Sequence, residues 1–109
     1  REIHSDNPDK LIGALIYFND QEEYGEGGDL VLYEPQAPSW SSHSNVRFPT
    51  HVDMKQSLRI SPKHNAGIIF LRTNNSYHAV DNITKSVPGK YRHFVNINIC
   101  SIVPIWPGF

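Results

Sequence analysis

Cysteine occurs once in the 109 residues, at Cys100, so the chain can form no internal disulfide and cannot hold a cluster that needs several thiolates. Neither sign of charge dominates, because ten Lys and Arg stand against eleven Asp and Glu, a net charge of −1. There is no basic stripe, so binding to nucleic acid through phosphate contacts is not indicated. No apolar run approaches the roughly 20 residues that a membrane span needs. No secretory signal opens the sequence, and we expect a cytoplasmic location.

Helix signals are also scarce. Eight prolines, seven glycines and frequent Asn and Asp separate short runs rich in Ile, Val, Leu, Tyr and Phe, and such runs are typical of strands. The length allows one small domain with one core. The pattern predicts an all-β sandwich or barrel. The expected strands cover residues 10–18, 28–34, 57–61, 66–71, 77–83 and 90–103.

The first of these strands, KLIGALIYF, is apolar on both faces, which favours a strand between two layers. Residues 19–29 are acidic and contain Gly27-Gly28, which indicates a solvated hairpin turn. A calcium loop is the alternative, although the carboxylates do not follow EF-hand spacing. The stretch 35–56 is long, rich in Pro and Ser, and carries Trp40. It is either a mobile loop that faces a substrate or a linker.

The six histidines fall into different surroundings. His43, His51 and His64 lie in polar, loop-like stretches, where exposure to solvent is expected. His78 follows the polar Asn74-Asn75-Ser76 and begins an apolar strand. Taken alone, a strand histidine is more often a hydrogen-bonded core residue than a metal ligand.

The stretch His4-Ser5-Asp6 stands just ahead of the first apolar strand. It is either a polar turn before a core strand or a metal-binding pair, since two residues that are two apart on an extended chain share a face. A third ligand from His78 would complete a set of two histidines and one carboxylate. That set leaves positions open on a six-coordinate metal and is typical of non-haem iron(II) oxygenases.

Arg92 follows a Pro88-Gly89 turn, and its strand could run back antiparallel beside His78. An arginine that points into an apolar interior needs an anionic partner, because an unpaired buried charge is costly. A bound carboxylate held by the planar guanidinium would meet that need.

Six pieces of the sequence, in order, resemble the iron(II)- and 2-oxoglutarate-dependent oxygenase superfamily: HSD, IYFN, GGDLVLYE, RISPKHNAGIIF, SYHAV and GKYRHFVNI. The resemblance implies a double-stranded β-helix (jelly roll), with residues 1–109 forming a single, partial domain. It implies that His4, Asp6 and His78 bind Fe(II), which makes them the catalytic centre. It also implies that Arg92 binds the distal carboxylate of the cosubstrate 2-oxoglutarate and that Tyr17 is a second contact to it.

The activity implied by this resemblance is that of a 2-oxoglutarate-dependent dioxygenase, which uses dioxygen to hydroxylate an unactivated C–H bond. The prime substrate is not identified by the sequence, and prolyl-hydroxylase-like and small-molecule substrates are both open. A cupin-like metal-binding jelly roll is one alternative, but it would not need Arg92. A zinc hydrolase is another, but no general base stands out near the ligands. A catalytically inactive oxygenase fragment is the third.

Two features depart from the superfamily pattern. Phe94 stands two residues after Arg92, where a small hydroxyl residue is frequent. Only three residues precede His4, so we expect a C-terminal catalytic core that lacks its N-terminal elements. Such a core would leave an open sheet edge beside its first ligand, and a homodimer is the predicted remedy.

Overall fold

The computed structural model describes residues 2–18, 25–37, 46–63, 65–73, 75–89 and 93–106. Within these ranges the chain is all-β, as predicted, and its one helical element is a 3-10 turn at His51–Asp53. No helix in the described part is long and apolar enough to cross a bilayer. The strands are β1 (Lys10–Tyr17), β2 (Gly25–Gly27), β3 (Leu30–Pro35), β4 (Met54–Ile60), β5 (Gly67–Leu71), β6 (Tyr77–Val80), β7 (Ile83–Ser86) and β8 (Phe94–Cys100).

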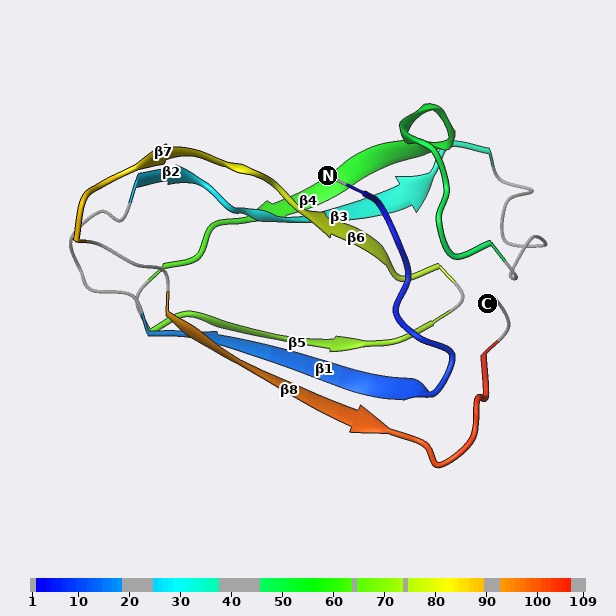
Figure 1. Cartoon of the computed structure of the whole chain (residues 1–109). Helices are drawn as coiled ribbons and strands as arrows, with labels where there is room; N and C mark the ends of the chain where they lie inside the picture. Colours follow the sequence, from blue (N-terminus) through cyan, green and yellow to red (C-terminus); the bar gives the residue numbers. More distant parts are fainter. Residues whose placement is uncertain are drawn as a thin grey trace.

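The strands form two facing layers (Figure 1). One layer is the antiparallel sheet β5-β1-β8, and the other is the antiparallel sheet β4-β3-β6. A two-stranded ladder, β2-β7, continues the second layer at one end (Figure 1). The space between the layers is where a site built from both sheets can form.

The sheet β4-β3-β6 uses its two faces differently. Leu30, His78 and Val80 line a cavity between the layers. Side chains alternate along a strand, so the neighbouring positions point to the opposite face. The buried cluster lies on that opposite face and consists of Ile3, Val31, Tyr33, Met54, Tyr77 and Ala79. The main core of the described chain therefore supports this sheet from behind and leaves its inner face for the site.

The sheet β5-β1-β8 presents Leu15, Phe70 and Asn96 to the cavity. Along each strand, the residues that alternate with these inward-facing ones point to the outer face. They are Ala, Ile, Leu and Val with one glycine, so the outer face is apolar. Ile69 is 80% exposed on this outer face. Ile16 of β1 is also exposed on this outer face. The first strand was expected to be covered on both faces, but the described residues cover only its inner face.

Several strand limits differ from those expected. The strand expected at 57–61 begins at Met54, and the strand expected at 77–83 is divided into β6 and β7. The short strand β2 was not predicted. Its Gly27 has φ +90°, and a Cβ there would lie 2.2 Å from the carbonyl oxygen of Asn82. Glycine thus permits the close approach of β2 to β7. Much of the predicted acidic turn (19–24) and of the long loop (38–45) lies outside the described residues.

Candidate metal centre

His4 and His78 are joined through their main chains. The His4 N–H donates to the His78 carbonyl at 3.0 Å, and the His78 N–H donates to the His4 carbonyl at 2.9 Å, which makes a single antiparallel bridge. On the other side of this segment, the Ser5 N–H donates to the carbonyl of Arg47 at 2.9 Å. The bridge sets the two histidines side by side, and Asp6 returns to the same side two residues later.

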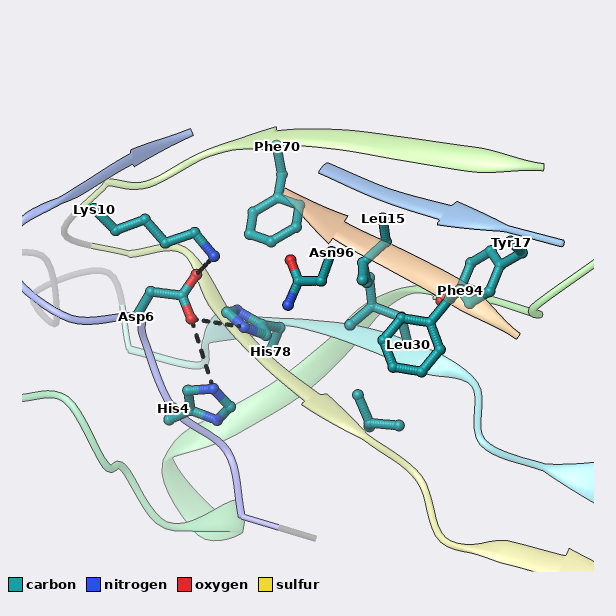
Figure 2. A pocket seen from close by; sticks show the side chains of 11 residues that line it. His4, Asp6, Lys10, Leu15, Tyr17, Leu30, Phe70, His78, Phe94 and Asn96 are labelled. Atoms are coloured by element: carbon teal, nitrogen blue, oxygen red, sulfur yellow. Dashed lines mark ion pairs between the residues drawn. The ribbon is translucent and has the colours of Figure 1, made fainter. Parts of the chain in front are cut away.

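Three ligand atoms converge here, one each from His4, Asp6 and His78, and all lie within 4.8 Å of one another. Oδ1 of Asp6 lies 3.3 Å from Nε2 of His78 and 3.8 Å from Nε2 of His4. The two imidazole rings have their centroids 4.5 Å apart. Figure 2 shows both imidazoles turned toward the one carboxylate at the end of the cavity.

Hydrogen bonds to the main chain set which ring nitrogen carries hydrogen. Nδ1 of His78 lies 3.0 Å from the carbonyl oxygen of Ser76, and Nδ1 of His4 lies 3.3 Å from that of Glu2. A carbonyl oxygen only accepts, so each Nδ1 must donate, and each neutral ring then presents the lone pair of Nε2. Two such lone pairs beside a carboxylate form a set of donors that suits a metal cation.

Asp6 is charged in these surroundings. Burial alone would raise the pKa of its carboxyl group, but the close contacts with His78 at 3.3 Å and with Lys10 at 2.8 Å outweigh burial and hold this pKa well below its usual range. Desolvation, and then the neighbouring His78, lower the pKa of His4. The charged carboxylate and the two Nε2 atoms therefore face one another at the point where a cation would bind.

Two arginines hold the main chain on either side of the Asp6 Cα. Arg47 donates from Nε and Nη2 to the carbonyl of Ser5, both at 3.3 Å. Arg72 donates to the carbonyl of Asp6, at 2.9 Å from Nη2 and 3.3 Å from Nε. Arg72 is only 2% exposed, its guanidinium carbon lies 5.5 Å from the ring centroid of Trp106, and burial lowers its pKa. The irregular segment is thus fixed by side chains where it lacks a full strand ladder.

A cavity of about 260 Å³ runs from these ligands between the two sheets. Tyr17 and Phe94 lie at its other end, with ring centroids 6.3 Å apart (Figure 2). Its walls are largely apolar, and its lining residues are His4, Asp6, Lys10, Leu15, Tyr17, Leu30, Phe70, His78, Val80, Phe94 and Asn96. A second, more polar cavity of about 340 Å³ shares four of these residues and is also lined by Asn7, Asp9, Arg47, Asn98 and Cys100.

Comparison with protein families adds the deciding observation. The family model described as the 2OG-Fe(II) oxygenase superfamily matches residues 2–100, nearly the whole chain. The chain belongs to this superfamily. Comparison with curated proteins and with solved structures found no match.

Membership of the 2OG-Fe(II) oxygenase superfamily implies Fe(II) and 2-oxoglutarate as metal and cosubstrate. Among the described residues, His4, Asp6 and His78 form the only group of three His, Cys, Asp or Glu side chains that are close enough together to hold one metal ion. This group fits such a metal. This is the two-histidine, one-carboxylate set that leaves coordination positions open.

The structure brings together most of the residues singled out in the sequence. Tyr17 lines the same cavity as the three candidate ligands. His51 and His93 are exposed. Arg92, His43, His64 and Trp40 lie outside the described residues, and the role of Arg92 stays a prediction.

One expected pairing is wrong. The strand after the Pro88-Gly89 turn does not pair with the strand of His78. Instead β8 pairs with β1 in the opposite sheet, while β6 pairs with β3 and with His4. Both hydrogen-bonding edges of β6 are therefore occupied, one by β3 and the other by His4.

Three cations at the centre were not predicted: Lys10, Arg47 and Arg72. Arg72 carried a usable signal, because it follows directly on an apolar strand and a buried guanidinium needs acceptors. Lys10 carried a weaker one, at the start of an apolar run. Arg47 lies within the stretch that was expected to face a substrate, and nothing in its local sequence distinguishes it.

Proposed function

We propose that the chain is an Fe(II)- and 2-oxoglutarate-dependent dioxygenase with a jelly-roll (double-stranded β-helix) fold, which hydroxylates an unactivated C–H bond of a prime substrate. In this proposal residues 1–109 belong to one domain. His4, Asp6 and His78 hold the metal. Tyr17 and Arg92 bind 2-oxoglutarate.

One observation carries the proposal. The donor atoms of His4, Asp6 and His78 lie within 4.8 Å of one another at the end of a cavity between two antiparallel sheets. The superfamily match over residues 2–100 supports the identity of the metal and of the cosubstrate.

When bound, the metal and cosubstrate supply the oxidative decarboxylation of 2-oxoglutarate to succinate and carbon dioxide, coupled to insertion of an oxygen atom into a C–H bond. The chain's own part is binding and orientation. The Nδ1 contacts of His4 and His78 hold both rings with Nε2 toward Asp6. The cavity walls beyond these ligands are largely apolar, formed by Leu15, Leu30, Phe70 and Val80 among others.

The cavity has polar side chains at both of its ends. One end holds the candidate metal ligands, and the other holds Tyr17 beside Phe94. Arg92 lies two residues before Phe94 in the sequence. In this proposal its guanidinium binds the distal carboxylate at the Tyr17 end, in the two-pronged manner that arginine favours.

The test is anaerobic loading with Fe(II), with and without 2-oxoglutarate, followed by metal analysis and calorimetry. We expect one equivalent of metal per chain and binding of 2-oxoglutarate that depends on the metal. Exposure to dioxygen should then yield succinate. The matched control is Asp53→Ala, which removes an acidic residue from the 3-10 turn, against Asp6→Ala at the centre.

Failure of the wild-type chain to retain metal, with Asp6→Ala behaving identically, would contradict the proposal. Metal and 2-oxoglutarate binding without succinate formation would support the catalytically inactive alternative. Metal binding with no effect of 2-oxoglutarate would favour the cupin-like alternative.

A further inference from the structure

We propose that Lys10 is a positioning residue of the metal centre, whose ammonium holds Oδ2 of Asp6 and leaves Oδ1 as the one carboxylate oxygen directed at the two imidazoles. The inference rests on the proposed function, in which Asp6 is a metal ligand. Nζ of Lys10 lies 2.8 Å from Oδ2, whereas Oδ1 is the oxygen nearest to His4 and His78.

Lys10 reaches this place because β1 is irregular where it begins. The register of β1 against β8 runs regularly from Tyr17 back to Ile12 and then shifts before Lys10. Strict alternation from Tyr17 and Leu15, which line the cavity, would put Lys10 on the outer, apolar face. A bulge re-aims one side chain. Lys10 is accordingly 9% exposed and lines the cavity.

Gly13 provides the space for the end of the Lys10 side chain. A Cβ at Gly13 would lie 2.8 Å from Nζ and 2.9 Å from Cε of Lys10, and 2.7 Å from Cζ of Phe70. These distances are shorter than van der Waals contact, so a larger residue would displace both side chains. Gly13 therefore leaves the room that this position of the Lys10 side chain uses.

Phe70 also contacts the ammonium group of Lys10. Nζ of Lys10 lies 4.8 Å from the centroid of the Phe70 ring, within the range of a cation–π contact. The same ring lies 5.5 Å from the ring of His78. Phe70 thus packs against the cation that holds Asp6 and also against a second candidate ligand.

The consequence concerns how Asp6 binds a metal. A carboxylate free to rotate can offer either oxygen or both, but a buried charge-assisted contact to Oδ2 fixes the plane of the group. Oδ1 alone then faces His4 and His78, so Asp6 would hold a metal by this one oxygen. Single-oxygen ligation leaves one more coordination position for cosubstrate and dioxygen. Contacts of this outer kind typically change metal affinity by about 10- to 100-fold.

The experiment uses Co(II) as the probe, because its visible spectrum reports the number and geometry of its ligands. Co(II) affinity by calorimetry and the spectrum of the bound ion are measured for wild type, Lys10→Met, Lys10→Arg and Gly13→Ala. Lys55→Met is the matched control, since Lys55 forms an exposed ion pair with Glu34.

We expect Lys10→Met to weaken Co(II) binding by about 10- to 100-fold and to change the spectrum toward higher coordination. Gly13→Ala should shift the spectrum in the same direction, although it keeps the charge of Lys10. Lys10→Arg should recover part of the affinity, and Lys55→Met should match wild type. A merely structural role for Lys10 would lower the urea midpoint and leave the spectrum of the folded protein unchanged.

An unchanged affinity and spectrum in folded Lys10→Met would overturn this inference alone, provided that Asp6→Ala still abolishes Co(II) binding. Should Lys10→Met fail to fold, the Gly13→Ala spectrum decides: a wild-type spectrum overturns the inference and a changed one supports it. A wild-type chain that binds no Co(II) would overturn the proposed function, and this inference with it.

Discussion

The main chains of His4 and His78 bond to each other in both directions, at 3.0 and 2.9 Å, and their rings lie 4.5 Å apart. Directly paired residues in an antiparallel bridge put their side chains on the same face. This single antiparallel bridge therefore brings together two imidazoles that are far apart in the sequence. The third candidate ligand, Asp6, follows two residues after the first.

Metal affinity should depend far more on His4 and His78 than on the other histidines of the chain. We expect His78→Ala to weaken Fe(II) or Co(II) binding by on the order of 100-fold or more, since loss of a ligand exceeds the effect of losing an outer contact. Calorimetry under anaerobic conditions measures it. His51→Ala is the matched control, because His51 lies exposed in the 3-10 turn. Equal losses in the two variants would contradict the assignment.

Arg72 should stabilise the segment that carries Asp6. Arg72→Met leaves the Asp6 carbonyl without its two guanidinium donors and removes the stacking on Trp106. Loss of hydrogen bonds at a buried acceptor costs about 1–3 kcal/mol of unfolding free energy. Urea denaturation followed by circular dichroism measures the change.

The matched control for Arg72 is Arg59→Met. Arg59 pairs with Asp29 and Asp81 on the surface of the second layer, and an exposed ion pair contributes little. The Arg59 variant should therefore unfold close to wild type. A larger loss in Arg59→Met than in Arg72→Met would show that the contact with Asp6 does not stabilise the fold.

Arg92 is predicted to bind the distal carboxylate of 2-oxoglutarate. Arg92→Lys should weaken 2-oxoglutarate binding to the metal-loaded protein by about tenfold or more, because an ammonium cannot reproduce the two parallel hydrogen bonds of a guanidinium. Calorimetry with metal held in excess measures it, and Arg59→Lys serves as the matched exchange. Unchanged affinity in Arg92→Lys would refute the role.

The predicted homodimer has a different structural basis from the one that first suggested it. The segment of His4 is flanked by β6 on one side and by the Arg47 carbonyl on the other, so its edge is partly covered by the chain itself. The apolar outer face of β5-β1-β8 remains, with Ile69 at 80% and Ile97 at 48% exposure. A face of this kind, on which the described strand residues of β5, β1 and β8 carry no charge, can pack against a second copy.

Light scattering should give a dimer mass for wild type and a monomer mass for Ile97→Lys. Val52→Lys is the control, because Val52 is 83% exposed in the 3-10 turn, away from this face. A wild-type chain that is monomeric at high concentration would rule the dimer out.

Much of the architecture follows from local pattern. The runs around β1, β3 and β5 are rich in Ile, Leu and Val and are flanked by turn residues, and each becomes a strand close to the expected limits. Period-2 alternation and turn chemistry are short-range properties, and a sequence carries them directly. The His4-Ser5-Asp6 spacing is of the same kind, because two residues that are two apart share a face wherever the chain is extended.

Pairing and register are long-range, and there the local pattern is insufficient. β8 could have bonded beside β6, but His4 and β3 occupy both edges of that strand, so β8 pairs with β1. Sequence order alone cannot decide between two available edges, because that choice depends on contacts between parts of the chain that are far apart in the sequence.

The position of Lys10 is decided in the same way. Alternation places its side chain outside, and only the shift in register against β8, with Gly13 leaving room, turns it inward to Asp6. The residue types at the centre were thus determined by the sequence. Which cation meets which oxygen was decided by tertiary packing, because a one-residue shift in a strand exchanges its two faces.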